Sequence, residues 1–553
     1  MGQKVLIIGG VAGGATAAAR LRRLDENAEI IIIERGQYVS YANCGLPYYI
    51  GGTIRNKNNL TLQNPQGFKE RFNIEVRINN EALAINRKSK TVQIKDINTN
   101  EIYEESYDKL ILSPGAKPLV PPIDGITIDE VFTLRNIPDT YKISDFIKNN
   151  SPKSALVIGG GFIGLEMAEN LSHKGIDVSL AEMSDHIMSA SLDFDTAAIV
   201  HTYMQYNGIN LYLNNAVKSI KKQTNSSGNL TITMANGENL TADMIILSAG
   251  VRPESDLAKS CGLELNKIGA IVVNEHMQTS DNDIYAVGDA IEITNFINGK
   301  RCNVPLAGPA NKQARIAADN IYGINSVYKG VQGSAILKLF DMSIASTGLN
   351  ESQIKQLGID YDKVVTISPS HATYYPGASS MTVKTIFNKE NGRILGAQIV
   401  GFDGVDKRID VLATAIRAKM TGFDLTELEL AYAPPFSSAK DPVNMAGYII
   451  ENIMNGIVKQ VHWHDIPLLA ENNDYILLDV RTPYEVSQGK ITGSINIELD
   501  SLRQNLDRLD KSKKIIVHCQ SGVRSYYAAR ILMEHGFDAY NLSGGYGFYS
   551  IVV

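Results

Sequence analysis

Two cysteines stand where a thiol could act as a nucleophile. Cys44 lies in SYANCGLPYYI, residues 40–50, at a predicted helix start, and Cys519 follows the predicted strand KIIVH, residues 514–518. Backbone N–H groups at a helix N-terminus stabilise a thiolate and lower its pKa. Both cysteines are therefore predicted to be low-pKa nucleophiles. Cys261 and Cys302 carry no motif and are predicted to be ordinary packed or surface thiols.

The composition predicts a globular protein of several domains in a reducing compartment. The 553 residues are 44% hydrophobic and 20% charged, and the net charge of -6 gives no reason to expect nucleic acid or an anionic membrane as a partner. The sequence contains no apolar run that could span a bilayer, and its start predicts a strand and a glycine turn instead of a signal peptide. Four cysteines are too few for a disulfide framework, which predicts a cytoplasmic location.

A glycine-rich turn close to the start of the chain has the layout of a dinucleotide-binding βαβ unit. The strand at residues 5–8 leads into GGVAGG and an Ala-rich helix, and the next strand ends in Glu34. Gly9 and Gly14 are predicted to hold a pyrophosphate at the helix N-terminus, and Glu34 a ribose hydroxyl. Arg35, which follows Glu34, is included in this predicted site. Val11 replaces the middle glycine of the usual G-x-G-x-x-G pattern.

The same layout recurs in ALVIGGGFIGLEMAENL, residues 155–171, this time with all three glycines at the usual spacing. These glycines are Gly159, Gly161 and Gly164. The strand that follows ends in Glu182. An acid at that place favours a free ribose hydroxyl, and so NADH over NADPH, without excluding NADPH.

Two further segments, YDKLILSPGAKP at residues 107–118 and TSDNDIYAVGDA at residues 279–290, complete a familiar order of motifs. Together with the two glycine turns they resemble the flavin-dependent pyridine nucleotide-disulfide oxidoreductases over about the first 450 residues. The resemblance implies FAD at the first turn, NAD(P)H at the second, and Asp289 on the ribityl chain of the flavin. It also implies that residues 326–450 form a dimerisation domain, and hence a homodimer.

A separate module follows, in which Cys519 opens the loop CQSGVRS and lies five residues before Arg524. This loop, one residue shorter than that of cysteine phosphatases, and its DVR and LSGGY flanks resemble single-domain rhodaneses. These sulfurtransferases carry a persulfide on the loop cysteine. Lys490 stands where many of them have histidine. The alternative is a degenerate rhodanese fold without catalysis, which the retention of Cys519 and Arg524 disfavours.

The expected fold class is α/β, with two Rossmann-like nucleotide-binding domains, an α+β dimerisation domain and a C-terminal rhodanese α/β domain. The sequence predicts no metal site. The expected boundaries are residues 1–120 plus 246–325 for FAD, 121–245 for NAD(P)H, 326–450 for dimerisation, 451–462 for a linker and 463–553 for the rhodanese.

Cys44 lacks the second cysteine of a C-x4-C redox disulfide, because Tyr49 occupies that position. Family members with one cysteine divide into two branches. Peroxidases and oxidases cycle a sulfenic acid and have a histidine in the first glycine loop, where this chain has Ala12. Coenzyme A-disulfide reductases form a mixed disulfide with coenzyme A, and SYANCGLPYYIGG resembles that branch.

That second resemblance implies further site residues. Ser40 and Asn43 belong to the matching stretch, and Tyr374 and Tyr432 match tyrosines that reach the cysteine from the partner subunit, where a phenol can protonate a leaving thiolate. Five cations are candidates for the phosphates of coenzyme A. Three lie on the helix after the first glycine loop, Arg20, Arg22 and Arg23, of which the resemblance favours Arg23, and the other two are Lys69 and Arg71.

The fusion resembles coenzyme A-disulfide reductase–rhodanese proteins. It implies electron transfer from NAD(P)H through FAD to a Cys44–coenzyme A disulfide, with coenzyme A disulfide, coenzyme A persulfide or polysulfide as substrate. Cys519 would supply sulfane sulfur from a donor. Two alternatives stay open: an NADH peroxidase or oxidase that cycles Cys44 sulfenic acid, and a redox-sensing scaffold with a non-catalytic rhodanese.

Overall fold

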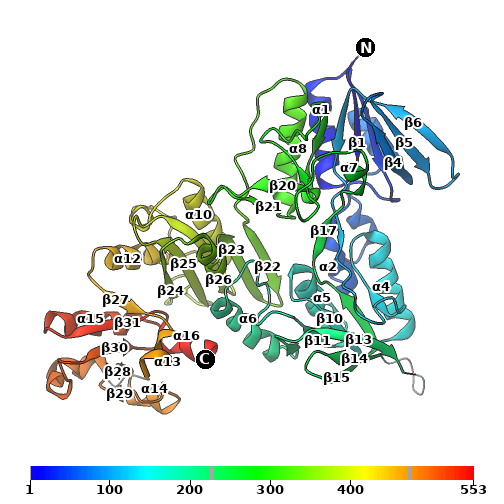
Figure 1. Cartoon of the computed structure of the whole chain (residues 1–553). Coiled ribbons are helices and arrows are strands. Elements are labelled where there is room, and N and C mark those ends of the chain that lie inside the picture. The colour runs from blue at the N-terminus through cyan, green and yellow to red at the C-terminus, as the bar shows by residue number, and fades with distance from the viewer. Residues whose placement is uncertain (1, 224–229, 471–474) are drawn as a thin grey trace. The chain divides into compact units, whose positions relative to one another are not determined.

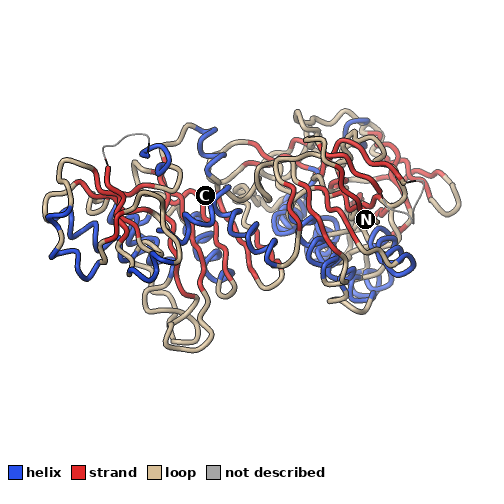
Figure 2. Tube along the Cα trace, turned by 90° about the horizontal axis from the view of Figure 1, so that it is seen from below, coloured by secondary structure: helices blue, strands red, loops and turns tan. Residues whose placement is uncertain are grey.

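The computed structural model describes residues 2–223, 230–470 and 475–553, and the chain forms two compact units (Figure 1). Unit 1 comprises Met1–Ser184 and Gly208–Gly333, and unit 2 comprises Asp185–Asn207 and Ser334–Val553. Both units combine sheets with helices, shown in red and blue in Figure 2, so the α/β prediction is confirmed. Among the helices in the described ranges, none has the length and apolarity needed to cross a membrane.

The first nucleotide-binding unit is a five-stranded parallel sheet in the order β19-β7-β1-β2-β3. Its strands are Ile284–Ala286 (β19), Lys109–Leu112 (β7), Lys4–Ile8 (β1), Glu29–Glu34 (β2) and Glu75–Ile78 (β3). The central strands are almost wholly apolar because helices and loops bury both faces of such a sheet. Helices α1 (Ala12–Leu24) and α8 (Ala307–Ile321) pack against each other. The predicted strand, glycine turn and helix at residues 5–24 are confirmed.

The second nucleotide-binding sheet, which also belongs to unit 1, repeats this plan with the strand order β12-β11-β10-β16-β9. Its strands are Asn210–Tyr212 (β12), Asp177–Ala181 (β11), Ser154–Ile158 (β10), Met244–Leu247 (β16) and Val131–Phe132 (β9). Helix α5 (Phe162–Ser172) packs on this sheet, and helix α4 (Ile137–Asn150) precedes β10 in the chain. Smaller sheets extend unit 1, with strands Asn80–Asn86 (β4), Thr91–Asp96 (β5), Ile102–Ser106 (β6), Val217–Lys222 (β13), Leu230–Met234 (β14) and Asn239–Ala242 (β15).

Unit 2 holds two five-stranded sheets. The first is antiparallel, with strands Ala335–Leu339 (β22), Met342–Gly348 (β23), Ile394–Gly401 (β26), Ser380–Asn388 (β25) and Tyr361–Pro369 (β24). The second is parallel, with strands Lys459–Val461 (β27), Asp538–Leu542 (β31), Lys514–His518 (β30), Tyr475–Asp479 (β28) and Ile495–Asn496 (β29). The helices of unit 2 include Glu351–Leu357 (α9), Val405–Arg417 (α10), Pro442–Met454 (α12), Pro483–Ser487 (α14), Val523–Glu534 (α15) and Gly545–Val552 (α16).

Two segments differ from the predicted domain boundaries. Helix α6 (Phe194–Tyr206), expected in the domain at residues 121–245, belongs to unit 2 because Ala198 packs with Val365 of β24 and Phe548 of α16. The expected linker at residues 451–462 contains strand β27, which pairs with β31 of the C-terminal sheet. The C-terminal sheet is therefore built partly from the expected linker.

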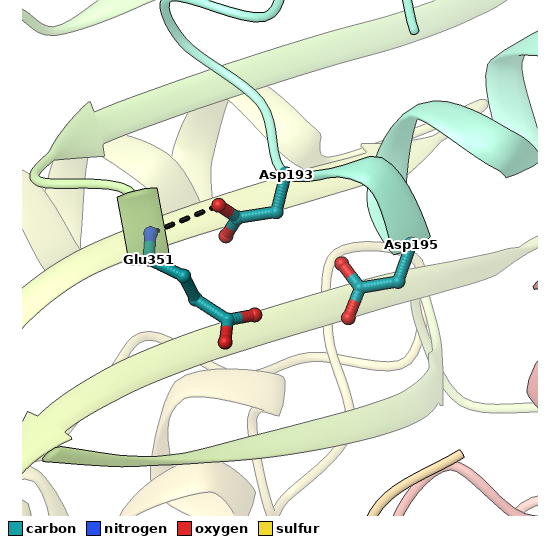
Figure 3. Close-up of side chains that lie close together, drawn as sticks. All are labelled: Asp193, Asp195 and Glu351. Carbon is teal, nitrogen blue, oxygen red and sulfur yellow. Dashed lines mark hydrogen bonds between the residues drawn. The ribbon is translucent and has the colours of Figure 1, made fainter. Parts of the chain in front are cut away.

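A cluster of buried charges joins the start of α6 to the antiparallel sheet. Asp193, Asp195 and Glu351 bring their carboxylates together, and the backbone N–H of Glu351 donates to Asp193 at 2.9 Å (Figure 3). Lys384, fully buried on β25, places its Nζ 2.9, 2.6 and 2.5 Å from these three carboxylates in that order. Lys363 lies 2.6 Å from Glu351. An ammonium group thus occupies the centre that a metal ion would need, and the cluster is an ion-pair network.

The cluster also holds the start of the C-terminal module. Burial acts to raise the pKa of Asp195, but Lys384 and Lys363 outweigh it and lower that pKa below its ordinary value. The carboxylate is therefore ionised, and it accepts a hydrogen bond from the Nε1–H of Trp463 at 3.2 Å. Trp463 lies two residues after the end of β27, so this bond ties the entry of the C-terminal sheet to α6.

Replacing Lys384 tests the network. Lys384→Ala leaves three buried carboxylates without their shared cation, so we expect the free energy of unfolding of unit 2 to fall by about 3–5 kcal/mol. The fluorescence of Trp463, the single tryptophan of the chain, reports that transition in urea. Lys389→Ala is the matched control, because it removes only an exposed pair with Asp360 and is expected to cost less than about 1 kcal/mol. Equal losses in the two variants would contradict the assignment.

Candidate functional site

The two glycine turns hold their strand-end acids in the same way. The N–H of Gly10 donates to Glu34 at 2.9 Å, and the N–H of Gly160 donates to Glu182 at 2.7 Å. Each carboxylate thus lies against its turn, at the carboxyl ends of parallel strands where nucleotides bind. Both turns also need a close approach of helix to strand. A Cβ on Gly14 would lie 1.8 Å from a carbonyl oxygen, and a Cβ on Gly164 would lie 1.9 Å from one.

The middle position of each turn explains why Val11 is tolerated. Val11 and Gly161 both precede the first residue of their helices, with φ of -97° and -82°. Neither angle requires glycine. A Cβ on Gly161 would have open space within 4 Å, so this face of the second turn leaves room for a phosphate group. The residues of both turns therefore fit the dinucleotides that the sequence predicts.

Asp289 and Arg35 occupy different surroundings. Asp289 lies in a short 3-10 turn, Gly288–Ala290, after β19, and burial raises the pKa of its carboxyl group. Such a polar group at a strand end, inside a nucleotide-binding sheet, suits a contact to a cofactor hydroxyl. Arg35 is half exposed, and its guanidinium pairs with Glu254 at 2.9 Å and with Glu81 at 3.8 Å. Its predicted cofactor contact stays a prediction.

Cys44 lies in the 3-10 turn Asn43–Gly45, which leads directly into helix α2 (Leu46–Gly51). The predicted helix start is thereby confirmed. All four cysteines lie within the described ranges and are free thiols, and Cys44 is exposed. Tyr49 lies on α2, where the second cysteine of an internal redox disulfide would stand. A disulfide at Cys44 therefore needs a sulfur from outside the chain.

The predicted low pKa of Cys44 is wrong for the chain by itself. Although the residue reaches solvent, the protein packed around its sulfur raises the pKa of the thiol, and the carboxylates of Glu166 and Asp289 raise it further. A backbone hydrogen bond in the turn lowers this pKa, but it is the smallest of the contributions. Within the chain alone, these groups favour the protonated thiol over the thiolate.

Glu166 and Tyr48 form a hydrogen-bonded pair close to this thiol. Helix α2 packs on α5, and the hydroxyl of Tyr48 donates to Oε1 of Glu166 at 3.2 Å. Burial raises the pKa of Glu166 to about 7, although the bond from Tyr48 opposes that shift. Burial and Glu166 in turn raise the pKa of Tyr48. Glu166 thus changes charge near neutral pH, beside a cysteine whose ionisation it influences.

Arg23 and Ser40 line one cavity of about 300 Å³. Its walls come from α1, from the loop residues Ser40 and Gln63, and from helix α3 (Pro65–Phe72). They include Thr16, Arg23, Ser40, Gln63, Phe68 and Phe72. The cavity combines a guanidinium, hydroxyl and amide groups with two aromatic rings. It can therefore receive a ligand that is anionic at one part and apolar at another.

The structure separates the basic candidates. Arg20 is paired with Asp319 at 2.6 Å, and Arg22 is buried and donates to backbone carbonyls, such as that of Ala28 at 2.8 Å. Neither arginine lines the cavity, which leaves Arg23 as the favoured one on this helix. Lys69 and Arg71 lie on α3 and do not line it either, and Lys69 donates to Asn73 at 2.8 Å.

Tyr374 and Tyr432 lie together in unit 2, with 2.8 Å between their hydroxyl oxygens. They are 74% and 47% exposed, and their hydrogen bond raises the pKa of Tyr374. Two phenols joined in this way on an open surface can pass a proton between them and act on a group that comes from another molecule.

Cys519 follows β30, and helix α15 begins four residues later at Val523. Its sulfur accepts the N–H of Gly522 at 3.2 Å and faces the hydroxyl of Ser525 at 3.3 Å. The turn requires Gly522, whose φ is +95°. Arg524 lies on the first turn of α15 and also contacts the sulfur, while Lys490 is exposed.

Three residues that lie beside the reactive cysteines or beside Arg524 were missed from the sequence alone. Glu166 and Tyr48 lie 118 positions apart in the chain, so nothing in the sequence showed that they pair. The one local signal was that Tyr48 lies four residues after Cys44. Glu485, whose carboxylate pairs with Arg524, could have been found through the capping-box spacing from Thr482 to Glu485 before a short helix.

Glu166→Gln tests the electrostatics at Cys44. Above a pH of about 7 the Glu166 carboxylate is charged and opposes the Cys44 thiolate, so removing that charge lowers the pKa of Cys44. We expect alkylation of Cys44 by iodoacetamide at about pH 8 to become roughly threefold to tenfold faster. Mass spectrometry of the Cys44 peptide across a pH series measures this rate, and Cys261 is the internal control. An unchanged or slower Cys44 reaction would refute the assignment.

The motifs and geometry agree with comparisons to known proteins. Residues 3–314 match the pyridine nucleotide-disulphide oxidoreductase family, residues 334–442 its dimerisation domain, and residues 465–549 the rhodanese-like domain. Coenzyme A disulfide reductase of Staphylococcus haemolyticus (strain JCSC1435) is 39% identical over 447 residues, which cover 81% of this chain and 99% of that protein.

Two solved structures resemble nearly the whole chain. Reduced CoADR-RHD of Bacillus anthracis has a TM-score of 0.96 and 50% identity, covering 100% of this chain and 98% of that one. A NAD-dependent persulfide reductase from A. fulgidus has a TM-score of 0.92 and 39% identity, covering 99% of both chains. The chain belongs to the pyridine nucleotide-disulphide oxidoreductase family, whose members use FAD and NAD(P)H, and it carries a C-terminal rhodanese-like domain.

Proposed function

We propose that this oxidoreductase passes electrons from NAD(P)H through FAD to a mixed disulfide between Cys44 and coenzyme A. Its substrates are coenzyme A disulfide, coenzyme A persulfide or polysulfide. The observation that carries the proposal is a free Cys44 with Tyr49 at the place of a second cysteine, because the sulfur that completes its disulfide must then come from a substrate. The names of the relatives, coenzyme A disulfide reductase and persulfide reductase, support this substrate class.

The two glycine turns divide the cofactors. Gly9, Gly14, Glu34 and Asp289 would hold FAD, which when bound relays two electrons between NAD(P)H and a disulfide. Gly159, Gly161, Gly164 and Glu182 hold the nicotinamide nucleotide. The Glu182 carboxylate, fixed by Gly160 at 2.7 Å and by Ser184 at 2.8 Å, would repel a ribose phosphate. This favours NADH over NADPH.

The cavity beside α1 receives part of coenzyme A. Arg23 pairs with a phosphate, Ser40 and Asn43 hold polar groups of the pantetheine arm, and Phe68 and Phe72 cover its apolar parts. Ser40 and Asn43 precede Cys44 in the same segment, so a chain that lies along this segment ends at the thiol. Lys69 and Arg71 remain candidates for a phosphate outside the cavity.

The Tyr374–Tyr432 pair supplies the proton of the reaction. The match to a dimerisation domain supports a homodimer, in which the two tyrosines of one protomer act on the substrate of the other. The Cys44 thiolate attacks one sulfur of coenzyme A disulfide, a new S–S bond forms, and a coenzyme A thiolate leaves. The tyrosine pair donates a proton to that leaving thiolate, as a general acid.

Reduction of the mixed disulfide completes the cycle. Two electrons from NAD(P)H cleave the S–S bond and return Cys44 to the thiolate and coenzyme A to the thiol. The net reaction consumes one NAD(P)H, one proton and one disulfide and yields NAD(P)⁺ and two thiols. Cys519 carries sulfane sulfur to coenzyme A, and the resulting persulfide is reduced at Cys44 with release of sulfide. We place the enzyme in the cytoplasm, where free thiols persist.

The mass of the Cys44 peptide tests the substrate assignment. Protein purified and digested without reductant is expected to carry coenzyme A on Cys44, and Cys44→Ser should carry none and lose reductase activity. An added oxygen atom without coenzyme A would instead point to sulfenic acid chemistry and to a peroxidase or oxidase. The flavin-dependent fold would stand in that case, and the coenzyme A assignment would be withdrawn.

Cys519→Ser tests the division of labour between the two thiols. This variant is expected to reduce added coenzyme A persulfide at close to the wild-type rate, because that step needs only Cys44. Sulfide release from other sulfane donors should fall at least about tenfold, since their sulfur must pass through the nucleophile. Equal losses in the two assays would contradict the relay.

A further inference from the structure

Two arginine side chains contact the loop around Cys519, and each already forms an ion pair with a carboxylate. Arg524 places both terminal nitrogens on Glu485, with Nη1 2.8 Å from Oε2 and Nη2 2.5 Å from Oε1. Arg481 contacts the loop through Gln520 at 3.3 Å and pairs with Asp479 at 2.7 Å. The N–H of Gly522 donates to the sulfur at 3.2 Å, and the charge of Arg524, which also contacts the sulfur, is offset by Glu485.

Glu485 is firmly held as an anion. The hydrogen bond from Arg524 lowers the pKa of Glu485 to about 2, so the carboxylate is charged at neutral pH. The N–H and the hydroxyl of Thr482 each donate to its Oε2 at 3.0 Å, in the capping box of α14. A substrate anion would have to compete with this fixed charge for Arg524.

Exposed apolar side chains flank the pair. Tyr484 precedes Glu485 and is 75% exposed, while Val523 precedes Arg524 and is 43% exposed. Tyr527, one turn further along α15, is 52% exposed. These residues suit a donor with an organic group next to its sulfur, such as a thiol persulfide, and offer little to a small inorganic anion.

We propose that Glu485 makes Cys519 selective for thiol persulfides over doubly charged sulfur donors such as thiosulfate. The inference rests on the proposed role of Cys519 as a sulfur carrier and names its donor class. The Cys519 thiolate attacks the outer sulfur of R–S–SH, a bond forms between the two sulfurs, and the inner S–S bond breaks. The electron pair leaves on R–S⁻, and Cys519 becomes the persulfide.

Loading of Cys519 in single-turnover reactions tests this choice. The full-length protein is mixed with the persulfide of 2-mercaptoethanol, whose organic group is uncharged, or with thiosulfate, and the gain of one sulfur atom on the Cys519 peptide is followed by mass spectrometry. We expect the wild type to load at least about tenfold faster from the persulfide. Glu485→Gln removes the charge but keeps the shape and the helix cap, and should raise loading from thiosulfate roughly tenfold while changing the persulfide rate less than about threefold.

Glu534→Gln is the matched control, because it breaks another arginine–glutamate pair on the same helix, Arg530 with Glu534. It should leave both rates unchanged. A preference for the persulfide that is the same in Glu485→Gln as in the wild type would overturn the proposal. Failure of both donors to load the wild type would overturn the sulfur-carrier role as well, so the two failures are distinguishable.

Salt provides a test that needs no variant. Screening weakens the repulsion between Glu485 and a dianion, so thiosulfate loading of the wild type should rise with ionic strength relative to persulfide loading. A ratio of the two rates that does not change with salt would overturn the proposal, whatever the folding of Glu485→Gln.

Discussion

A thiolate needs its negative charge balanced, and the two cysteines of this chain meet that requirement differently. Cys519 receives an N–H from Gly522 at 3.2 Å within its own loop. Cys44 has carboxylates for neighbours, and both burial and Glu166 raise its pKa. The thiol of Cys44 therefore stays protonated in the chain alone, and its activation depends on what binds beside it.

Charge balance also organises the second unit. Lys384 lies fully buried among three carboxylates, an arrangement that is costly unless every charge is paired. Asp195, one of the three, also accepts the Nε1–H of Trp463. The helix that follows the nucleotide-binding strands, the dimerisation sheet and the entry to the rhodanese-like sheet therefore share one network. Loss of one ammonium group would expose all three elements to the same unpaired charge.

Local patterns in the sequence determined most of the architecture. The two glycine turns, the acids Glu34 and Glu182 and the loop from Cys519 to Arg524 are each set within a short segment. The backbone itself imposes their geometry, since a turn, a close helix approach or a positive φ depends on neighbouring residues. Residue types near one another in the chain therefore identified the nucleotide-binding units and the rhodanese-like loop. The absence of a second cysteine near Cys44 was equally plain.

Tertiary structure alone decided the surroundings of the reactive sulfurs. Glu166 and Tyr48 are 118 positions apart in the chain, and Glu485 and Arg524 are 39 positions apart. No helix or strand periodicity in the sequence can therefore predict either pair. The pKa of a thiol depends on burial and on all charges nearby, so the helix start at Cys44 alone predicted a lowered pKa where the structure raises it. The same holds for α6, whose apolar face finds its partners in unit 2. The sequence determined which groups carry the chemistry, and the packing of distant segments decided how strongly each is charged, because electrostatic energy depends on distance in space and on desolvation.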